Sequence, residues 1–420
     1  GAWSTFWAQV GTPPQNVRLL PATGGTSIWV VVPAGCISEY GPKCDQNRGG
    51  LFLSNESTSW DQIGLYVLNL FTEEGLGYYG NALYGFETVT LGDQGSGLPT
   101  LQHQVVGGIA LQQFWLGTLP LEPWPVNFTS QNDPQDGLLT SLKKNQDIGS
   151  LSWGYTAGGN ARSPQVLGSL TLGGYDASRF EPSGVTFGFG GDISRDLLIP
   201  IPQIQTSNGF RYSQNQFYFI DSLVPDLWLP DEACTVFEKA FSLTYDNDTQ
   251  MYLVSKALRE QLLGQNNSVT FTIGPGNDIN TGNQSDKTFT ITLPYWAFDL
   301  AADIPLTPNS THYFPLRRAS DNATQYTLGR TFLQAAYVVA DYESGNFSVN
   351  AALFPEQGAQ EQLVPILAKL TQTAGPTNGS GDSSSSLGGG AIAGIVIGAI
   401  AAIAIVGLAA FFIWRKKRRQ

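Results

Sequence analysis

The stretch that decides the fold is "LLPATGGTSIWV", which covers residues 19–30. Apolar runs on both sides of a Thr-Gly-Gly bend predict two strands joined by a tight turn at residues 22–25. A second stretch, "YFIDSLVPDLWL" at residues 218–229, aligns with the first without a gap and places Asp221 opposite Ala22. The chain therefore contains an internal repeat that is built around two turns.

The repeat extends beyond the turns themselves. Each stretch has a tryptophan seven positions after its key turn residue, and these are Trp29 and Trp228. Further along, "FWLGTLPL" around Gly117 and "YTLGRTFL" around Gly329 repeat a pattern of two apolar residues followed by glycine. We therefore expect two similar lobes, related by a pseudo-two-fold axis, whose turns face each other across a central cleft.

The composition favours an all-β architecture. The 420 residues include 48 glycines and 24 prolines but a single methionine, and no long amphipathic helical period is visible. This is typical of many short strands joined by tight turns. We expect an N-terminal lobe at 1–185 and a C-terminal lobe at 186–370, followed by a flexible Gly/Ser-rich linker at 371–390.

The carboxyl end predicts a membrane anchor. Residues 391–414 are uncharged throughout, and such a run is long enough for a helix across the roughly 30 Å hydrocarbon core of a bilayer. Five basic residues within 415–420 favour a cytoplasmic flank, so we expect a single-pass type I protein whose folded part is extracellular. A GPI signal also ends in an apolar tail, but that tail normally lacks a basic stop. No secretory leader is visible at Gly1, so we expect a chain that is processed or incomplete there.

Charge and sequons agree with a location at the cell surface. The formal net charge is -12, and without the last six residues it becomes 17 minus 34, or -17, which argues against a nucleic-acid partner. An exported domain with repeated N-x-S/T sequons is expected to be a glycoprotein. The nine sequons begin at Asn55, Asn127, Asn247, Asn266, Asn283, Asn309, Asn322, Asn346 and Asn378.

Three cysteines fit an oxidising compartment. Cys36 and Cys44 are eight positions apart in one loop and are expected to form a disulfide. Cys234 is left over, and we interpret it as a buried thiol, with an intermolecular bridge as the alternative. A catalytic cysteine is disfavoured because neither His103 nor His312 has the context of a base. The scarcity of His and Cys also argues against a zinc site, and no metal or cofactor is expected.

Several segments in order resemble the pepsin-like aspartic peptidases, from Phe6 to about Phe354. "VGTPPQNVRLL" is similar to the opening strands of that family, "GFETVTLG" to the end of its flap hairpin, and "YTLGRTFLQAAYVVADYESGNFSV" to its closing segment. The resemblance implies a bilobal double β-barrel with a central cleft. It also implies that each lobe contributes one D-[ST]-G-[ST] turn, whose two aspartates share a proton and hold the water that attacks a peptide bond. A membrane-anchored domain of this kind resembles fungal surface proteins.

The first turn lacks the acid of the family pattern. It reads A-T-G-G, so Ala22 presents a methyl group where the family has an aspartate. Thr23 keeps the hydroxyl that, in the family, braces the two turns against each other, and Gly24 keeps the glycine.

The second turn keeps its acid but differs from the family pattern in the residues that follow it. It reads D-S-L-V, so Asp221 keeps one carboxylate and Ser222 keeps the bracing hydroxyl. Leu223 and Val224 add apolar bulk where the catalytic water would need room. A single carboxylate cannot act as general base and general acid at once, and the members of such a set act as a unit. We therefore expect no proteolytic activity.

Two alternatives stay open at this stage. The nearest acids in sequence that could replace the missing aspartate are Glu39, Asp45 and Asp226, and all are expected to lie beyond the hydrogen-bond reach of about 3 Å. The flap residue that closes over a substrate is expected to be Tyr78 or Tyr79.

We favour a surface module that binds peptide or surface polymer in its cleft, or that acts in sensing or adhesion. The alternative is a true acid endopeptidase with a degenerate site, and the oligomeric state is left open.

Overall fold

The computed structural model describes residues 3–128, 133–277, 284–319, 323–356 and 358–368. The chain divides into a compact unit at Gly1–Lys369 and a second unit at Leu370–Gln420. The predicted linker, membrane span and basic flank all lie outside the described residues, so they stay predictions. Within the part of the chain that is described, no helix is both long and apolar enough to cross a membrane.

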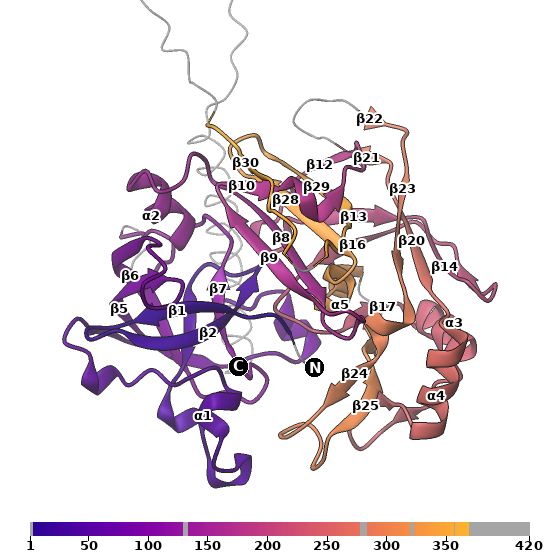
Figure 1. Ribbon diagram of the computed structural model, residues 1–420, viewed down its shortest axis with the longest axis horizontal. Coiled ribbons are helices and arrows are strands. Elements are labelled where there is room, and N and C mark those ends of the chain that lie inside the picture. Colours follow the sequence, from indigo (N-terminus) through magenta and orange to yellow (C-terminus); the bar gives the residue numbers. More distant parts are fainter. Residues whose placement is uncertain (1–2, 129–132, 278–283, 320–322, 357, 369–420) are drawn as a thin grey trace, which may run out of the picture. The chain divides into compact units, whose positions relative to one another are not determined.

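The first half of the chain forms a seven-stranded sheet in the order β1-β2-β7-β3-β6-β5-β4. Figure 1 labels β1, β2, β5, β6 and β7 of this sheet. Strand β1 also pairs with β5, which curls the sheet into a barrel-like ring. The inward-facing apolar side chains of this ring form a buried cluster. The strands are β1 (Phe6–Val10), β2 (Gln15–Ala22), β3 (Ile28–Val31), β4 (Asp61–Val67), β5 (Asn81–Leu91), β6 (Thr100–Ile109) and β7 (Gly117–Pro120).

A second sheet combines strands from the two predicted lobes. Its order is β11-β29-β28-β8-β9, and β12 also pairs with β29. The strands are β8 (Ser152–Gly159), β9 (Val166–Leu172), β11 (Phe180–Glu181), β12 (Thr186–Gly188), β28 (Ala336–Asp341) and β29 (Asn346–Ala352); beside them β10 (Gly174–Asp176) pairs with β30 (Leu363–Pro365). The lobe boundary at residue 185 stays a prediction, because this sheet joins segments from both sides of it.

The second half of the chain forms smaller sheets in the orders β13-β16-β27-β17-β26, β15-β14-β20-β23, β18-β19-β25-β24 and β21-β22. Their strands are β13 (Leu198–Ile201), β14 (Gln203–Thr206), β15 (Arg211–Tyr212), β16 (Gln216–Ile220), β17 (Leu227–Leu229), β18 (Tyr245–Asp246), β19 (Met251–Leu253), β20 (Val269–Ile273), β21 (Gly276–Asn277), β22 (Gln284–Ser285), β23 (Phe289–Leu293), β24 (Leu300–Ala302), β25 (Thr311–Phe314), β26 (Leu316–Arg318) and β27 (Thr327–Leu328).

Within the described residues, helices are few and short, as the composition predicts. The α-helices are α1 (Cys44–Asn47), α2 (Leu138–Lys144), α3 (Asp231–Phe241), α4 (Lys256–Gln265) and α5 (Arg330–Leu333). The 3₁₀ turns are η1 (Pro33–Gly35), η2 (Ser38–Tyr40), η3 (Ser54–Glu56), η4 (Glu73–Leu76), η5 (Ala177–Arg179), η6 (Ile193–Arg195), η7 (Tyr295–Phe298) and η8 (Ala323–Gln325). The described fold is mostly β with barrel-like sheets, which is consistent with the pepsin-like all-β class.

The internal repeat is visible in the strand pairing. In the first half β7 lies between β2 and β3, parallel to the former and antiparallel to the latter, and β3 is parallel to β6. In the second half β27 lies in the same way between β16 and β17, and β17 is parallel to β26. The two repeated sequence stretches therefore form the same four-strand arrangement.

The repeated glycines are explained by close backbone approaches. A Cβ atom at Gly117 would lie 2.2 Å from the carbonyl oxygen of Trp29, and one at Gly329 would lie 2.4 Å from that of Asp226. No side chain fits at such a distance, so both halves need glycine where these two backbone segments approach each other.

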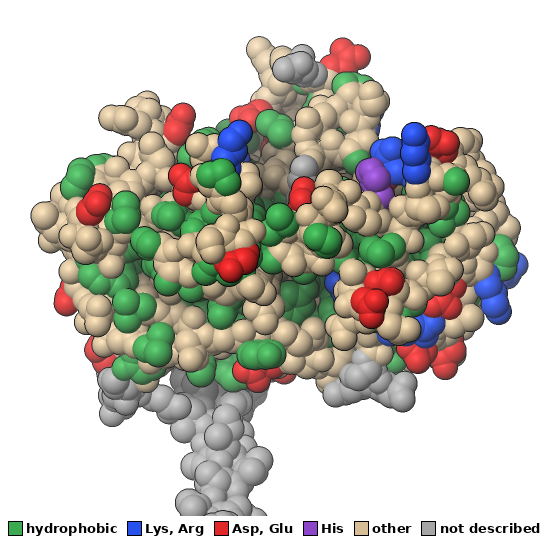
Figure 2. Space-filling view, turned by 90° about the horizontal axis from the view of Figure 1, so that it is seen from below, with side chains coloured by type: hydrophobic (Ala, Val, Ile, Leu, Met, Phe, Trp, Pro, Cys, Tyr) green, Lys and Arg blue, Asp and Glu red, His purple; other side chains and the backbone are tan. Residues whose placement is uncertain are grey.

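Charged side chains do not form a continuous basic surface on the face seen in Figure 2. Acidic side chains are spread over this face, and most of the basic ones lie toward one side of it. This distribution gives a nucleic-acid backbone no continuous basic stripe to follow on this face.

Candidate functional site

Two reciprocal hydrogen bonds join the turns that the sequence repeat singled out. The Thr23 N–H donates to Ser222 Oγ at 2.8 Å, and the Ser222 N–H donates to Thr23 Oγ1 at 2.9 Å. The Ser222 hydroxyl in turn donates to the carbonyl of Pro21 at 2.6 Å. The residues that precede these two, Ala22 and Asp221, are thereby brought to the same place.

Asp221 is fully buried at this junction. Its Oδ1 accepts the N–H of Leu223 at 2.8 Å, whereas Oδ2 has no N–H or hydroxyl partner among the described residues. The guanidinium of Arg330 lies nearby and donates to the carbonyls of Ser222 and Leu223. Burial raises the pKa of Asp221 to about 6, although the Leu223 N–H, Glu73 and the Arg330 charge oppose this.

Ala22 is enclosed by apolar side chains. Its methyl group is fully buried, and Leu223 of the second turn belongs to the same buried cluster. Leu68 and Leu70, which follow β4, complete the cluster on the side of the flap hairpin. Ala22 and Leu223, one from each turn, therefore belong to the same buried apolar cluster.

The fourth residue of the first turn is matched to this alanine. Gly25 stands where the family pattern has a hydroxyl residue, and a Cβ atom at Gly25 would lie only 2.9 Å from the Cβ of Ala22. A larger residue at position 25 would therefore need the turn to shift.

A second carboxyl group reaches Asp221 from the loop between β4 and β5. We call this loop, residues 68–80, the flap tip; it contains η4. The side chain of Glu73 is 2% exposed, and its carboxyl group lies within hydrogen-bonding reach of the Asp221 carboxyl, whose charge raises the pKa of Glu73. An ideal Cβ atom at Gly24 would lie 3.4 Å from a carboxyl oxygen of Glu73 and 3.6 Å from one of Asp221, so the three meet at one point.

The carboxyl pair must hold a proton. Two ionised carboxylates are both acceptors only, so a hydrogen bond between Glu73 and Asp221 needs one of them to be protonated. Burial and the charge of Asp221 raise the pKa of Glu73 well above its ordinary value. The arrangement is thus a proton-sharing pair of carboxyl groups, with a glutamate in place of the aspartate that Ala22 replaces.

Two further buried acids lie near this pair. Glu122, which follows β7, has a pKa raised well above its ordinary value by burial and by the charges of Asp196, Glu73 and Asp221. Burial also raises the pKa of Asp196 to about 7. The region therefore concentrates negative charge as soon as its protons are lost.

The two flap tyrosines lie in different environments. Tyr78 is partly buried and its ring packs against that of Phe114, with the ring centroids 5.6 Å apart. Tyr79 is 63% exposed. Of the two candidates, Tyr78 is the one whose ring lies within the site region.

None of the three acids that the sequence suggested as replacements pairs with Asp221. Glu39 in η2 and Asp45 in α1 are exposed. Asp226 is buried, but its Oδ2 is paired with the guanidinium Nε of Arg317 at 2.9 Å. The carboxyl group that does lie beside Asp221, that of Glu73, is not predicted from the sequence, because "FTEEGLG" carries no motif that distinguishes one glutamate from its neighbour.

The cysteines lie as the spacing indicates. Cys36 and Cys44 form a disulfide with their Cα atoms 5.7 Å apart. Cys234 is a free, buried thiol in α3. Of the nine sequon asparagines, Asn283, Asn322 and Asn378 lie outside the described residues, Asn346 is partly buried in β29, and the other five are exposed.

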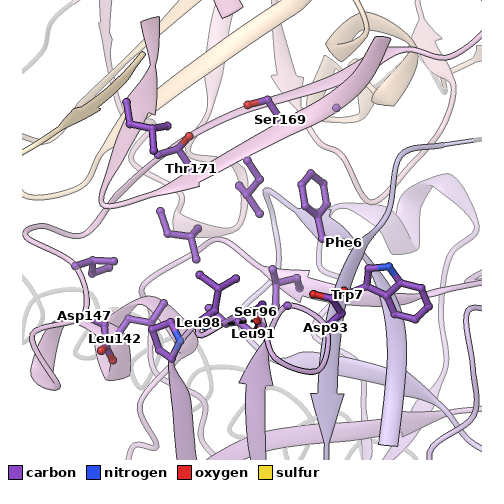
Figure 3. Close-up of a pocket in the computed structure, with 18 of the residues that line it drawn as sticks. Phe6, Trp7, Leu91, Asp93, Ser96, Leu98, Leu142, Asp147, Ser169 and Thr171 are labelled. Atoms are coloured by element: carbon purple, nitrogen blue, oxygen red, sulfur yellow. Dashed lines mark hydrogen bonds between the residues drawn. The ribbon is translucent and has the colours of Figure 1, made fainter. Parts of the chain in front are cut away.

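A cavity of about 570 Å³ lies away from the two turns. It is lined by residues of β1, the β5–β6 connection and β9, including Phe6, Leu98 and Thr171 (Figure 3). None of its lining residues belongs to either turn or to the flap tip. The cavity is therefore not part of the carboxyl site.

The comparisons with known proteins bear on the family and on the fold class. No family model matches the chain. Over 394 residues the chain is 23% identical to the aspartic proteinase yapsin-3 of Saccharomyces cerevisiae, and the alignment covers 87% of this chain and 68% of the relative. This similarity supports a pepsin-like aspartic peptidase family.

Proposed function

We propose that this chain is a glycosylated, membrane-anchored ectodomain of the pepsin-like type that binds peptide or a cell-surface polymer and does not hydrolyse it. The observation that carries the proposal is the buried apolar cluster that joins Ala22 to Leu223. In the pepsin-like peptidases, the nucleophile is a water held between two aspartates. Here the methyl group of Ala22 provides no carboxylate to bind that water, and the side chain of Leu223 occupies the space that the water would need.

Peptide binding does not need the missing acid. An extended peptide can be held by backbone hydrogen bonds along strand edges, and pockets for its side chains then give specificity. The relative named above is a proteinase, and in the present chain reciprocal hydrogen bonds join the two turns. The proposal is therefore that recognition is retained and hydrolysis is lost.

The decisive experiment is an assay of the full-length chain in detergent micelles on denatured protein between pH 3 and 5. We expect no cleavage that pepstatin, a peptide inhibitor of this peptidase class, can block. The matched control is Asp221→Asn, because cleavage that persists in this variant comes from a contaminant. Pepstatin-sensitive cleavage by the wild type that disappears in Asp221→Asn would overturn the proposal.

A second function has one specific observation in its favour. The Glu73–Asp221 pair is a proton-sharing pair of carboxyl groups, which is the device that acid peptidases use. The alternative is therefore an acid endopeptidase in which Glu73 replaces the first aspartate. The same assay with Glu73→Gln decides it, because a cleaving enzyme of this kind would lose its activity.

The topology is tested separately. The proposed extracellular side requires that the sequons are modified in a eukaryotic host. Removal of N-linked glycans should lower the apparent mass of the membrane-bound protein. An unchanged mass, with all nine sequons unmodified, would overturn the extracellular assignment.

A further inference from the structure

The flap tip contacts the second half of the chain at three separate points. The Thr72 hydroxyl donates to the carbonyl of Ser194 at 3.3 Å. Gly75 lies so close to η8 that a Cβ atom there would be 2.3 Å from Oε1 of Gln325. The third contact is the hydrogen bond between Glu73 and Asp221. The flap tip is therefore closed onto the turn that carries the remaining aspartate.

Of these three contacts, only the carboxyl pair depends strongly on pH. Thr72, Ser194 and Gln325 do not titrate, whereas the hydrogen bond of Glu73 to Asp221 requires a proton. If that proton is lost, two negative charges face each other in a buried position, where their repulsion is much stronger than in water.

The other charged and titratable groups around the pair come from four elements. Glu122 after β7 and Asp196 before β13 are acids and add to the repulsion once they ionise. Arg330 in α5 is the nearby cation and favours the ionised form of Asp221. Tyr78 of the flap tip itself has its pKa raised by burial and stays neutral below pH 10. Among the described residues near the pair, the guanidinium of Arg330 is therefore set against the carboxyl groups of Glu73, Asp221 and Glu122, and the charge of Asp196 acts on Glu122.

We propose that the Glu73–Asp221 hydrogen bond is a proton-dependent latch, which holds the flap tip closed over the two turns while the pair shares a proton and releases it when that proton is lost. This rests on the proposed function, because the groove that the flap tip covers is the peptide site proposed there. Release of the flap tip is the step that would admit an extended peptide.

The direction of the pH effect follows from the sign of the shifts. Both carboxyl groups have raised pKa values in the closed form, that of Asp221 to about 6. The closed form therefore binds more protons than an open form with solvated carboxyls, and it is favoured at acidic pH. As the pH rises through about 6, Asp221 loses its proton while Glu73 keeps the one that the pair shares. As the pH rises further, through the raised pKa of Glu73, that last proton is lost and the flap tip opens.

Hydrogen–deuterium exchange of the full-length chain in detergent micelles tests this directly. Peptides that cover the flap tip are followed by mass spectrometry at pH 4, 6 and 8, after correction for the intrinsic exchange rate. Strand β16 serves as the internal reference for global unfolding. We expect the protection of the flap tip to fall at least about tenfold between pH 4 and 8 while β16 stays protected.

Three variants separate the latch from a general pH effect. Glu73→Gln keeps a hydrogen-bond donor for Asp221 but cannot ionise, so its flap tip should stay protected at all three pH values. Glu73→Ala removes the bond and should exchange fast at all three. Glu74→Gln is the matched control, because Glu74 is the exposed neighbour in the same turn and its variant should follow the wild type.

Equal protection of the wild-type flap tip at pH 4 and 8, or a Glu73→Gln variant that opens like the wild type, would overturn the latch. If Glu73→Ala fails to fold, the comparison of Glu73→Gln with the wild type still decides the question. The measurement uses no peptide and no cleavage. A failed latch and a failed proposal of non-cleaving function are therefore seen in different experiments.

Discussion

The two turns rest on the same four-strand arrangement, yet they have kept different parts of the expected pattern. The first turn keeps Gly24 and has no acid, whereas the second keeps Asp221 and has Leu223 in place of the glycine. Both keep the hydroxyl residue that bonds to the opposite turn. The difference teaches that the groups that hold the turns together are separable from the groups that would perform hydrolysis.

The largest expected effect is a gain of activity when the two turns are made alike. Ala22→Asp alone should give no detectable cleavage, because Leu223 and Val224 still crowd the water site. Ala22→Asp combined with Leu223→Gly and Val224→Thr is the smallest set that we expect to cleave. In a pH 3 to 5 assay it should exceed the same set carrying Asp221→Asn by roughly 1,000-fold.

Glu73 sharpens this prediction. In the combined variant it would be a third carboxyl group beside the restored pair, so adding Glu73→Gln should increase the cleavage rate further. Activity from Ala22→Asp alone would show that the second turn is less obstructed than its leucine suggests.

The next largest effect concerns the glycines behind the turns. Gly117→Ala and Gly329→Ala should each lower the free energy of unfolding by about 3 kcal/mol or more, because a methyl group at 2.2 or 2.4 Å from a carbonyl oxygen forces the backbone apart. Denaturant unfolding measures this, and Gly264→Ala is the control because nothing lies within 4 Å of its Cβ position. A large effect at only one of the two sites would break the symmetry of the repeat.

Of the two turns, only the second, which kept its acid, should contribute to the pH dependence of stability. The pKa of Asp221 is raised from 3.8 to about 6, so the folded form holds this proton at a pH where the unfolded chain has lost it. Stability should fall by roughly 3 kcal/mol between pH 4 and 6 from this group. Asp221→Asn should remove that part of the fall in denaturant unfolding, while the part from Asp196 continues toward pH 7. Identical profiles for variant and wild type would contradict the assignment.

The smallest expected effect is the loss of one bracing hydroxyl. Thr23→Ala and Ser222→Ala each leave a buried N–H of the opposite turn without its acceptor, which costs about 2 kcal/mol of unfolding free energy. Thr23→Ser keeps the hydroxyl and should cost much less. If the two alanine variants differ by more than about 1 kcal/mol, the turns do not brace each other equally.

The fold could be predicted from the sequence as far as local pattern determines it. The repeat could be predicted because strand pairing and close backbone approach restrict which residues are possible. Its signals are the apolar runs beside each turn, the repeated Trp and the repeated Gly. The disulfide between Cys36 and Cys44 could be predicted because two cysteines in one short loop are close enough to pair with each other. The boundary between the lobes is harder to predict from the sequence, because one sheet contains strands from both predicted lobes.

The site could be predicted only where it depends on the repeat. Ala22, Asp221 and the two bracing hydroxyls follow from the alignment of the two stretches. Glu73 does not, because its burial results from how the flap tip folds onto the other half of the chain. Glu74 beside it is chemically identical and exposed, so residue type alone could not distinguish them.

The sheet that β8 and β9 share with β28 and β29 has a consequence for biosynthesis. When β9 ends at residue 172, the strand that completes its sheet has not been made, because β28 begins at residue 336. At about 5 to 20 residues per second, the ribosome needs roughly 10 to 30 s to supply it. During that time β8 exposes an unpaired edge, which can pair with other chains. The nascent protein therefore has to be protected from aggregation before its own carboxyl half arrives.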